Sequence, residues 1–227
     1  MVGPPGAGKS LLACDFGKFV LSSGGILLSG KFDQLQQGKP FSALASAFDD
    51  HCGCLLQATL QNREVIASEL RSSLGGEAYY LAKIIPNLAI ILGLEPSSVN
   101  YYDDCFNAQK RLEYLLCQFV DVISSTFAAP VALFLDDLQW ADPASISAVA
   151  QLLFTSQSRR FFFLGCCREG EFNEGHPVSK LLSNATTLGV PCTNVNLDCM
   201  DEESANTMIS ETLCLFPRLT RSLSNII

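Results

Sequence analysis

Apolar and polar residues follow two different periods along the chain, one typical of helices and one typical of strands. Residues 10–25 have a helical period that a serine–glycine run ends. Their apolar stripe consists of Leu12, Phe16, Phe19 and Val20. Four short runs predict strands: 26–32, 130–137, 159–169 and 193–198. The run 130–137 is almost continuously apolar, as expected of a parallel strand buried on both faces.

Between the first two predicted strands and after them, the pattern is helical. Residues 41–129 form an enlarged helical insertion, which Pro86 must kink or divide. Further helices are expected at 141–156, 176–185 and 201–216. Asp142 is placed to cap the first of these, with Pro143 at its first position, and Asp201 lies near the start of the last. Strands alternating with helices predict an α/β fold with a parallel sheet wrapped by helices.

The stretch "GPPGAGKS" at residues 3–10 matches the phosphate-loop pattern G-x-x-x-x-G-K-[ST] in full. Glycines let the backbone turn its N–H groups toward phosphate oxygens, and the following helix points its positive end at them. Lys9 would contact the β- and γ-phosphates, and the Ser10 hydroxyl would bind Mg²⁺. The candidate nucleotide-binding residues are Gly3, Pro4, Pro5, Gly6, Ala7, Gly8, Lys9, Ser10 and Leu11.

Two acids end the apolar run 130–137 and supply the partners that a phosphate loop needs. Asp136 is placed to hold Mg²⁺, and Asp137 to orient or activate a water for attack on the γ-phosphate. Alone, such a pair would equally suit a solvated loop or a helix cap. Together with the loop at 3–10, it predicts ATP binding with Mg²⁺ as cofactor.

Three further residues each allow two interpretations. Arg168 lies at the carboxyl end of a predicted strand, at the edge of the sheet where ligands bind, so its guanidinium is placed to sense the γ-phosphate. The alternative is a surface arginine paired with Glu169 or Glu171. We interpret Trp140 as a packing residue rather than a stacking platform, and Arg111 as part of a solvated helix face.

Composition narrows the class of protein. The 227 residues are 48% hydrophobic and 17% charged, with a net charge of −8 and no cluster of lysine or arginine. This balance excludes a disordered chain and gives no basic footprint for direct nucleic-acid binding. No apolar run reaches membrane-spanning length, and no secretory signal is present. The ten cysteines include no CxxC pair, so we expect reduced, mostly buried thiols in a cytoplasmic protein.

The phrases "GPPGAGKS", "LFLDDLQWADPAS" and "FFFLGCCRE", in this order, resemble the AAA+-related signal-transduction ATPases with numerous domains. "GKFDQLQQGKPFSALASAF" and "IIPNLAIILG" are also similar to segments of the members associated with kinases. The resemblance covers nearly the whole chain. It implies one AAA-like domain over 1–227 with sheet order 5-1-4-3-2, which acts as a switch-type ATPase attached to kinase, cyclase or regulatory domains.

Carried over by position, the resemblance makes Lys9 and Ser10 the phosphate-loop pair, Asp136 the magnesium acid, Asp137 the catalytic water-orienting acid and Arg168 the sensor. Adenine as the base rests on the resemblance alone. A nucleotide-dependent oligomer would fit this class of switch.

The chain also departs from the family pattern. Strand 1 of the family is reduced to Met1 and Val2, so its two neighbours are expected to lose their shared ladder. The start of a helical lid is expected at about 200–227. We therefore predict a fragment, or a mis-started reading frame, of a longer signalling protein. The alternatives are an interaction module that has lost nucleotide turnover, and an ATPase related to replication initiators.

Overall fold

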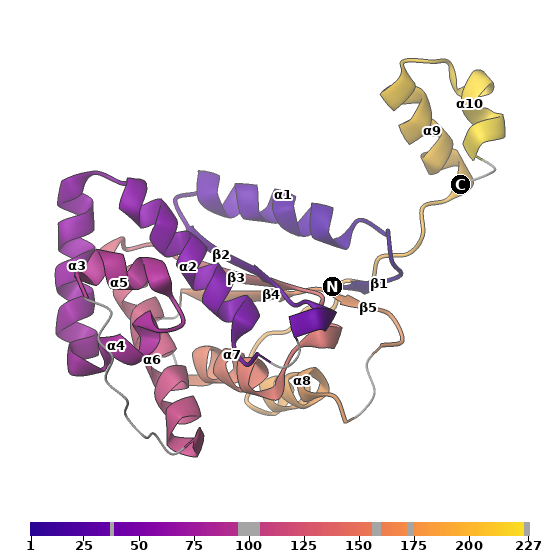
Figure 1. Ribbon diagram of the computed structural model, residues 1–227. Coiled ribbons are helices and arrows are strands. Elements are labelled where there is room, and N and C mark those ends of the chain that lie inside the picture. Colours follow the sequence, from indigo (N-terminus) through magenta and orange to yellow (C-terminus); the bar gives the residue numbers. More distant parts are fainter. Residues whose placement is uncertain (37–38, 95–104, 156–159, 172–174, 225–227) are drawn as a thin grey trace.

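The structure is a computed structural model that describes residues 1–36, 39–94, 105–155, 160–171 and 175–224 (Figure 1). The strands are β1 (Val2–Gly3), β2 (Ile26–Lys31), β3 (Val131–Asp136), β4 (Phe161–Gly165) and β5 (Cys167–Arg168). The longer helices are α1 (Lys9–Ser22), α2 (Ser42–Gln57), α3 (Leu60–Leu74), α6 (Cys105–Thr126), α7 (Pro143–Thr155), α8 (Pro177–Thr187) and α9 (Glu202–Leu213). The shorter ones are α4 (Ala78–Ala82), α5 (Pro86–Leu92), α10 (Pro217–Ser224) and the 3₁₀ turns η1 (Gln34–Gln36), η2 (Gly75–Glu77) and η3 (Leu138–Trp140).

All strand pairs are parallel. β2, β3 and β4 form one sheet in that order, with Val131 of β3 between Ile26 and Phe161. β1 pairs with β5, which follows β4 after one residue, and Val2 also bridges to Asn196. The ladder therefore runs from the Asn196 segment through β1, β4–β5 and β3 to β2. This arrangement confirms the predicted α/β class and follows the expected strand order.

The pairing around β1 corrects two expectations. The predicted strand 193–198 is reduced to a single bridge at Asn196. Conversely, the short β1 keeps hydrogen bonds with both neighbours: Val2 N donates to Val195 O (2.9 Å) and Leu197 N donates to Val2 O (2.8 Å). On its other side, Cys167 N donates to Met1 O (3.0 Å). The backbone groups of Met1, Val2 and Gly3 are therefore enough to preserve the ladder on both sides.

The two faces of the sheet carry cores of very different size. In Figure 1, α1 covers one face, whereas α7 and α8 lie on the opposite side. The α7 side shares one large core with the helical insertion, and Phe48 and Phe119 are among its fully buried residues. The α1 side holds a small cluster of Ala13, Phe134 and Cys166. β3 is buried at every position, as its apolar sequence predicts.

The stripe expected to bury α1 lies largely on its outer surface. Leu12 and Phe19 are exposed, Phe19 to 65%. The face that packs on the sheet is built from Ala13 and Gly17 instead. A side chain at Gly17 would press on Leu27 of β2, so the small residues let the helix lie close to the strands. The helical spacing of the apolar residues predicted the helix correctly. Which face of α1 lies closest to the sheet depends instead on the small size of Ala13 and Gly17.

The predicted helical insertion at 41–129 contains α2 to α6 and packs at the end of the sheet away from β1 (Figure 1). Pro86 divides it, because α5 begins at that residue. Residues 95–104 of the insertion lie outside the described residues. Arg111 is not simply solvated: its guanidinium carbon lies 4.4 Å from the centre of the Tyr80 ring.

The last two helices stand apart from the rest of the molecule in Figure 1, after the extended segment that follows α8. Asp201, which the sequence places near the start of this helix, caps α9 and accepts from Ser204 N at 2.7 Å. α10 packs against α9, and Asn206 joins them by donating to Pro217 O (3.0 Å) and accepting from Thr220 Oγ1 (2.7 Å). The expected helix at 201–216 is therefore half of a helical pair.

Candidate phosphate-loop site

The loop between β1 and α1 requires glycine for two different reasons. Gly6 and Gly8 have φ of 81° and 86°, the left-handed region that residues with a Cβ rarely adopt. Gly3 has no such φ, but a Cβ there would collide with the backbone oxygen of Leu197. These glycines let the chain turn sharply out of β1 and enter α1 at Lys9.

Lys9 is held inside this turn. Its side chain is 8% exposed, and its Nζ donates to the carbonyl oxygens of Gly3 (2.8 Å) and Pro4 (2.7 Å). A buried ammonium group must be hydrogen-bonded to offset the loss of its hydration. The two carbonyls do this and hold the positive charge at the first turn of α1, beside the N–H groups of the helix end.

Ser10, in the first turn of α1, contacts Asp136 at the end of β3. The Ser10 hydroxyl donates to Asp136 Oδ2 at 2.7 Å, although the residues are 126 positions apart. Asp136 is the last residue of β3 and is buried, and its Oδ1 accepts from Asp137 N at 2.9 Å. The fold therefore places a hydroxyl oxygen and a carboxylate from the two sequence motifs side by side.

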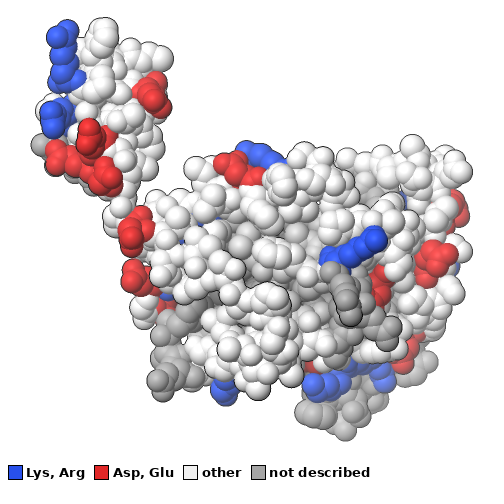
Figure 2. All heavy atoms as spheres, turned by 180° about the vertical axis from the view of Figure 1, so that it is seen from behind, with Lys and Arg blue, Asp and Glu red and all other residues white. Residues whose placement is uncertain are grey.

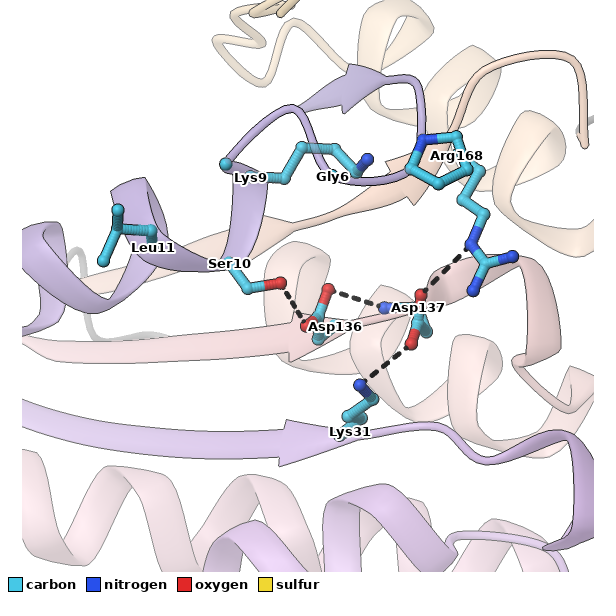
Figure 3. Close-up of a pocket in the computed structure, with 10 residues that line it drawn as sticks. Gly6, Lys9, Ser10, Leu11, Lys31, Asp136, Asp137 and Arg168 are labelled. Atoms are coloured by element: carbon cyan, nitrogen blue, oxygen red, sulfur yellow. Dashed lines mark hydrogen bonds and ion pairs between the residues drawn. The ribbon is translucent and has the colours of Figure 1, made fainter. Parts of the chain in front are cut away.

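Asp137 is turned sharply out of β3. It has a left-handed backbone (φ 54°, ψ 46°) and is the N-cap residue that precedes η3. Its Oδ2 lies 3.2 Å from the Nζ of Lys31, and its Oδ1 accepts from Gln139 Nε2 at 2.8 Å. Figure 3 shows Lys31 and Arg168 pointing toward Asp137 from different strands. The acid is thus flanked by two cations.

Arg168 lies between Asp137 of the site and Glu171, the partner named in the alternative interpretation. Its Nε is 3.9 Å from Asp137 Oδ1, and its NH1 is 3.6 Å from Glu171 Oε1. Both separations are long for ion pairs, and the side chain is partly exposed. The guanidinium is therefore only loosely held at the edge of the site.

Three strands end at this site. Lys31 is the last residue of β2, Asp136 of β3 and Arg168 of β5. Carboxyl ends of parallel strands share one edge of a sheet, where ligands bind in open α/β folds. The sequence reasoning used this rule for Arg168 but missed Lys31, although "GKF" at the end of a predicted strand carried the same signal. It also missed Gln139, which lies in no recognised catalytic pattern.

A cavity of about 320 Å³ opens between the loop and the strand ends. That volume is near the lower end for small-molecule sites, about 300–1,000 Å³. It is lined by Pro5, Gly6, Gly8, Lys9, Ser10, Leu11, Lys31, Asp136, Asp137 and Arg168 (Figure 3). Gly3, Pro4 and Ala7, also candidates, do not line it: the first two hold Lys9, and Ala7 N bonds back to Pro4 O at 3.3 Å.

Two neighbouring cysteines lie behind the cavity. Burial, together with the nearby charge of Asp136, raises the pKa of the Cys166 thiol to about 12. Burial also raises the pKa of the Cys167 thiol. Both therefore stay neutral packing residues. The expectation of mostly buried cysteines was wrong for the described chain, where Cys14, Cys54, Cys192, Cys199 and Cys214 are exposed.

Surface properties add two observations. The face in Figure 2 is largely uncharged over its centre, with lysines and arginines scattered rather than gathered into a patch. Within the described residues, no helix combines the length and the apolar character that crossing a bilayer requires.

Trp140 packs against the main core, as its interpretation as a packing residue predicted.

Comparisons with known proteins agree with this geometry. The Hybrid signal transduction histidine kinase G of Dictyostelium discoideum is 29% identical over 132 residues, covering 56% of this chain. The match spans only 4% of that kinase. No solved structure matches the chain. A family model described as AAA ATPase domain matches residues 1–164, the part that contains the loop, β2, β3 and most of β4. The chain therefore belongs to the AAA ATPase domain family.

Proposed function

We propose that this chain is an ATP-binding, Mg²⁺-dependent ATPase module that works as a switch within a larger signalling protein. The observation that carries the proposal is the hydrogen bond between Ser10 and Asp136, next to the buried Lys9, in one cavity. A hydroxyl, a carboxylate and an ammonium from two distant segments meet there. A chance glycine-rich turn would not require such partners.

The donor set fits magnesium. Mg²⁺ prefers oxygen ligands and usually takes one or two from the protein, the rest coming from water and phosphate. The Ser10 hydroxyl and the Asp136 carboxylate are two oxygen donors within 2.7 Å of each other. When bound, the ion would neutralise charge that develops on the phosphate oxygens. Ser10 and Asp136 are the residues that would hold it.

The remaining residues suit a triphosphate. The backbone of the loop 4–8 and the positive end of α1 would bind phosphate oxygens, and Lys9 would exchange its two carbonyl partners for them. Asp137 would orient the attacking water and accept its proton. Arg168 would contact the γ-phosphate, for which its loose pairing leaves the guanidinium available.

The signalling context is the less direct part of the proposal. Support comes from the histidine kinase of Dictyostelium discoideum, since the matched region is a small fraction of a long protein. We place this module beside kinase, cyclase or regulatory domains. The difference between its ATP and ADP states would be passed to them, with nucleotide-dependent oligomerisation as one route.

The test is ATP binding by calorimetry with and without Mg²⁺, followed by steady-state hydrolysis. We expect Lys9→Ala to reduce ATP affinity at least 100-fold, because it removes the buried charge at the phosphates. Lys18→Ala is the matched control: Lys18 lies on the same helix, but it is exposed and pairs with Asp15. Its affinity should stay within about twofold of the parent chain.

Two results would contradict the proposal. One is an absence of ATP binding by a chain that unfolds cooperatively and is therefore folded. The other is equal affinity of the Lys9 and Lys18 variants. Binding without measurable hydrolysis would favour the alternative of an interaction module that has lost turnover.

A further inference from the structure

Gln139 is a buried polar residue directly behind the candidate site. It lies in η3, two residues after Asp137, and is 8% exposed. It does not line the cavity, so its side chain is not placed to touch a bound nucleotide. A buried side-chain amide is costly unless its donors and acceptor are paired. Its partners are therefore informative.

The amide joins the two segments that carry Asp137 and Arg168. Its Nε2 donates to Asp137 Oδ1 at 2.8 Å, and its Oε1 accepts from the backbone N of Arg168 at 3.3 Å. Only this orientation satisfies both contacts. A flipped amide would set oxygen against the carboxylate and NH₂ against the N–H of Arg168.

Asp137 needs such a support. A left-handed backbone in a residue other than glycine costs on the order of 1 kcal/mol or more and persists only when its surroundings hold it. The backbone N of Asp137 bonds to Asp136 Oδ1, and its carbonyl accepts from Trp140 N at 3.0 Å. These bonds hold the main chain. For the carboxylate, Gln139 is the buried contact, whereas Lys31 is exposed over most of its side chain.

We infer that Gln139 is a positioning residue that fixes the Asp137 carboxylate relative to the strand of Arg168, and so sets the attacking water against the γ-phosphate. The inference rests on the proposed function. It adds a division of labour: Lys9 and Ser10 determine binding, whereas Gln139 acts on the rate of hydrolysis through Asp137. A displacement of about 1 Å in a catalytic group can cost about 100-fold in rate.

Two substitutions distinguish the two hydrogen bonds that the Gln139 amide makes. Gln139→Met has a similar length and makes neither hydrogen bond. Gln139→Glu keeps an acceptor for Arg168 N but sets a second carboxylate against Asp137. We expect both variants to bind ATP within about threefold of the parent chain and to lose at least tenfold in kcat, Gln139→Glu more than Gln139→Met. Gln118→Met is the control, since that amide donates to the Tyr114 hydroxyl on α6.

A second measurement does not need hydrolysis. In the nucleotide-free protein, NMR should show a displaced carboxyl carbon signal of Asp137 in both variants. The amide proton of Arg168 should exchange at least tenfold faster in Gln139→Met, which lacks its acceptor, and at nearly the parent rate in Gln139→Glu. A merely structural role would instead lower the unfolding temperature without moving the Asp137 signal.

The outcomes distinguish this inference from the proposed function. A folded parent chain that binds no ATP overturns both. A parent chain that binds and hydrolyses ATP, together with a folded Gln139→Met variant of unchanged kcat, overturns this inference alone. An unmoved Asp137 carboxyl signal in Gln139→Glu would also overturn this inference. That measurement is sufficient by itself if the Gln139→Met variant does not fold.

Discussion

At the scale of single residues, the site is a balance of charges at the ends of neighbouring strands. Lys31 and Arg168 flank Asp137, while the Ser10 hydroxyl contacts Asp136. The cations of the site differ in how firmly they are held. Lys9 is buried and donates two hydrogen bonds, whereas the ion pairs of Arg168 are long. A loosely paired guanidinium costs little to move to a new anion.

Arg168 should therefore discriminate between nucleotides that differ by one phosphate. We expect Arg168→Ala to weaken ATP binding about tenfold while ADP binding changes less than threefold, since a charge-assisted hydrogen bond contributes about 1.5–3 kcal/mol. Calorimetric titration with both nucleotides measures the ratio. Arg160→Ala is a suitable control, because Arg160 is exposed and bonds to Ala128 O. Equal losses for ATP and ADP would contradict a γ-phosphate contact.

His51 makes stability depend on pH. Its Nε2 is buried without a hydrogen-bond partner, and burial lowers the pKa of the imidazole to about 4. The unfolded chain takes up this proton below its ordinary pKa of about 6.5, whereas the folded chain does not until about pH 4. Stability is therefore complete above pH 6.5 and falls as pH drops toward 4, by about 2–3 kcal/mol in total.

The His51→Leu variant should lose this part of the acid sensitivity. Urea unfolding at pH 7 and pH 4.5 would measure the difference in unfolding free energy for both chains. We expect the pH-dependent loss to be about 2 kcal/mol smaller in the variant. An identical loss in both chains would show that other groups account for the acid sensitivity.

At the scale of elements, the sequence predicted the features that depend on neighbouring residues and missed those that depend on packing between distant segments. The strand predicted at 130–137, which spans Val131–Asp136, and the cap at Asp142 follow from adjacent residues and were confirmed. The outward stripe of α1 and the reduction of strand 193–198 depend on what packs nearby, which periodicity does not contain. The same contrast holds at the site. The candidate residues in the two motifs could be named from the sequence, whereas Gln139 was missed because its contacts with Asp137 and Arg168 depend on the fold.

The cap of α7 offers a test at this scale. Asp142 accepts from Ser145 N at 2.8 Å and from the Ser145 hydroxyl at 2.6 Å. Asp142→Ala removes both bonds, and a lost cap costs about 1 kcal/mol. We expect the unfolding temperature to fall by about 2–4 °C, measured by calorimetry. Asp142→Asn, which retains capping ability, should recover most of that loss, and a failure to do so would argue against a capping role.

At the scale of the whole molecule, the chain consists of one continuous α/β body and a helical pair beyond it. The body is held by one large core on the α7 side, while the α1 side leaves Phe162 of β4 49% exposed. Phe16 packs against Phe162 with ring centres 5.3 Å apart and the ring planes tilted by 45°. α9 and α10 bury few residues, and these include Ile209 and Thr220. The helical pair therefore adds little to the stability of the body.

Two truncations test this division. A chain ending at Cys199 keeps the bonds of Val2 to Val195 and Leu197, so its unfolding temperature should stay within about 2 °C of the parent. A chain ending at Val190 loses both bonds and should unfold several degrees lower. If the first truncation destabilised the protein as much as the second, the helical pair would have to contribute to the body.

The pairing of Val2 with Asn196 also has a consequence for the order of folding. It joins positions almost 200 residues apart in the sequence, so that contact requires closure of a very long loop. Helices and neighbouring strands with nearer partners are expected to assemble first. The phosphate loop, which starts at the end of β1, would then become ordered in the final step, and ATP could not act as a template for the earlier ones.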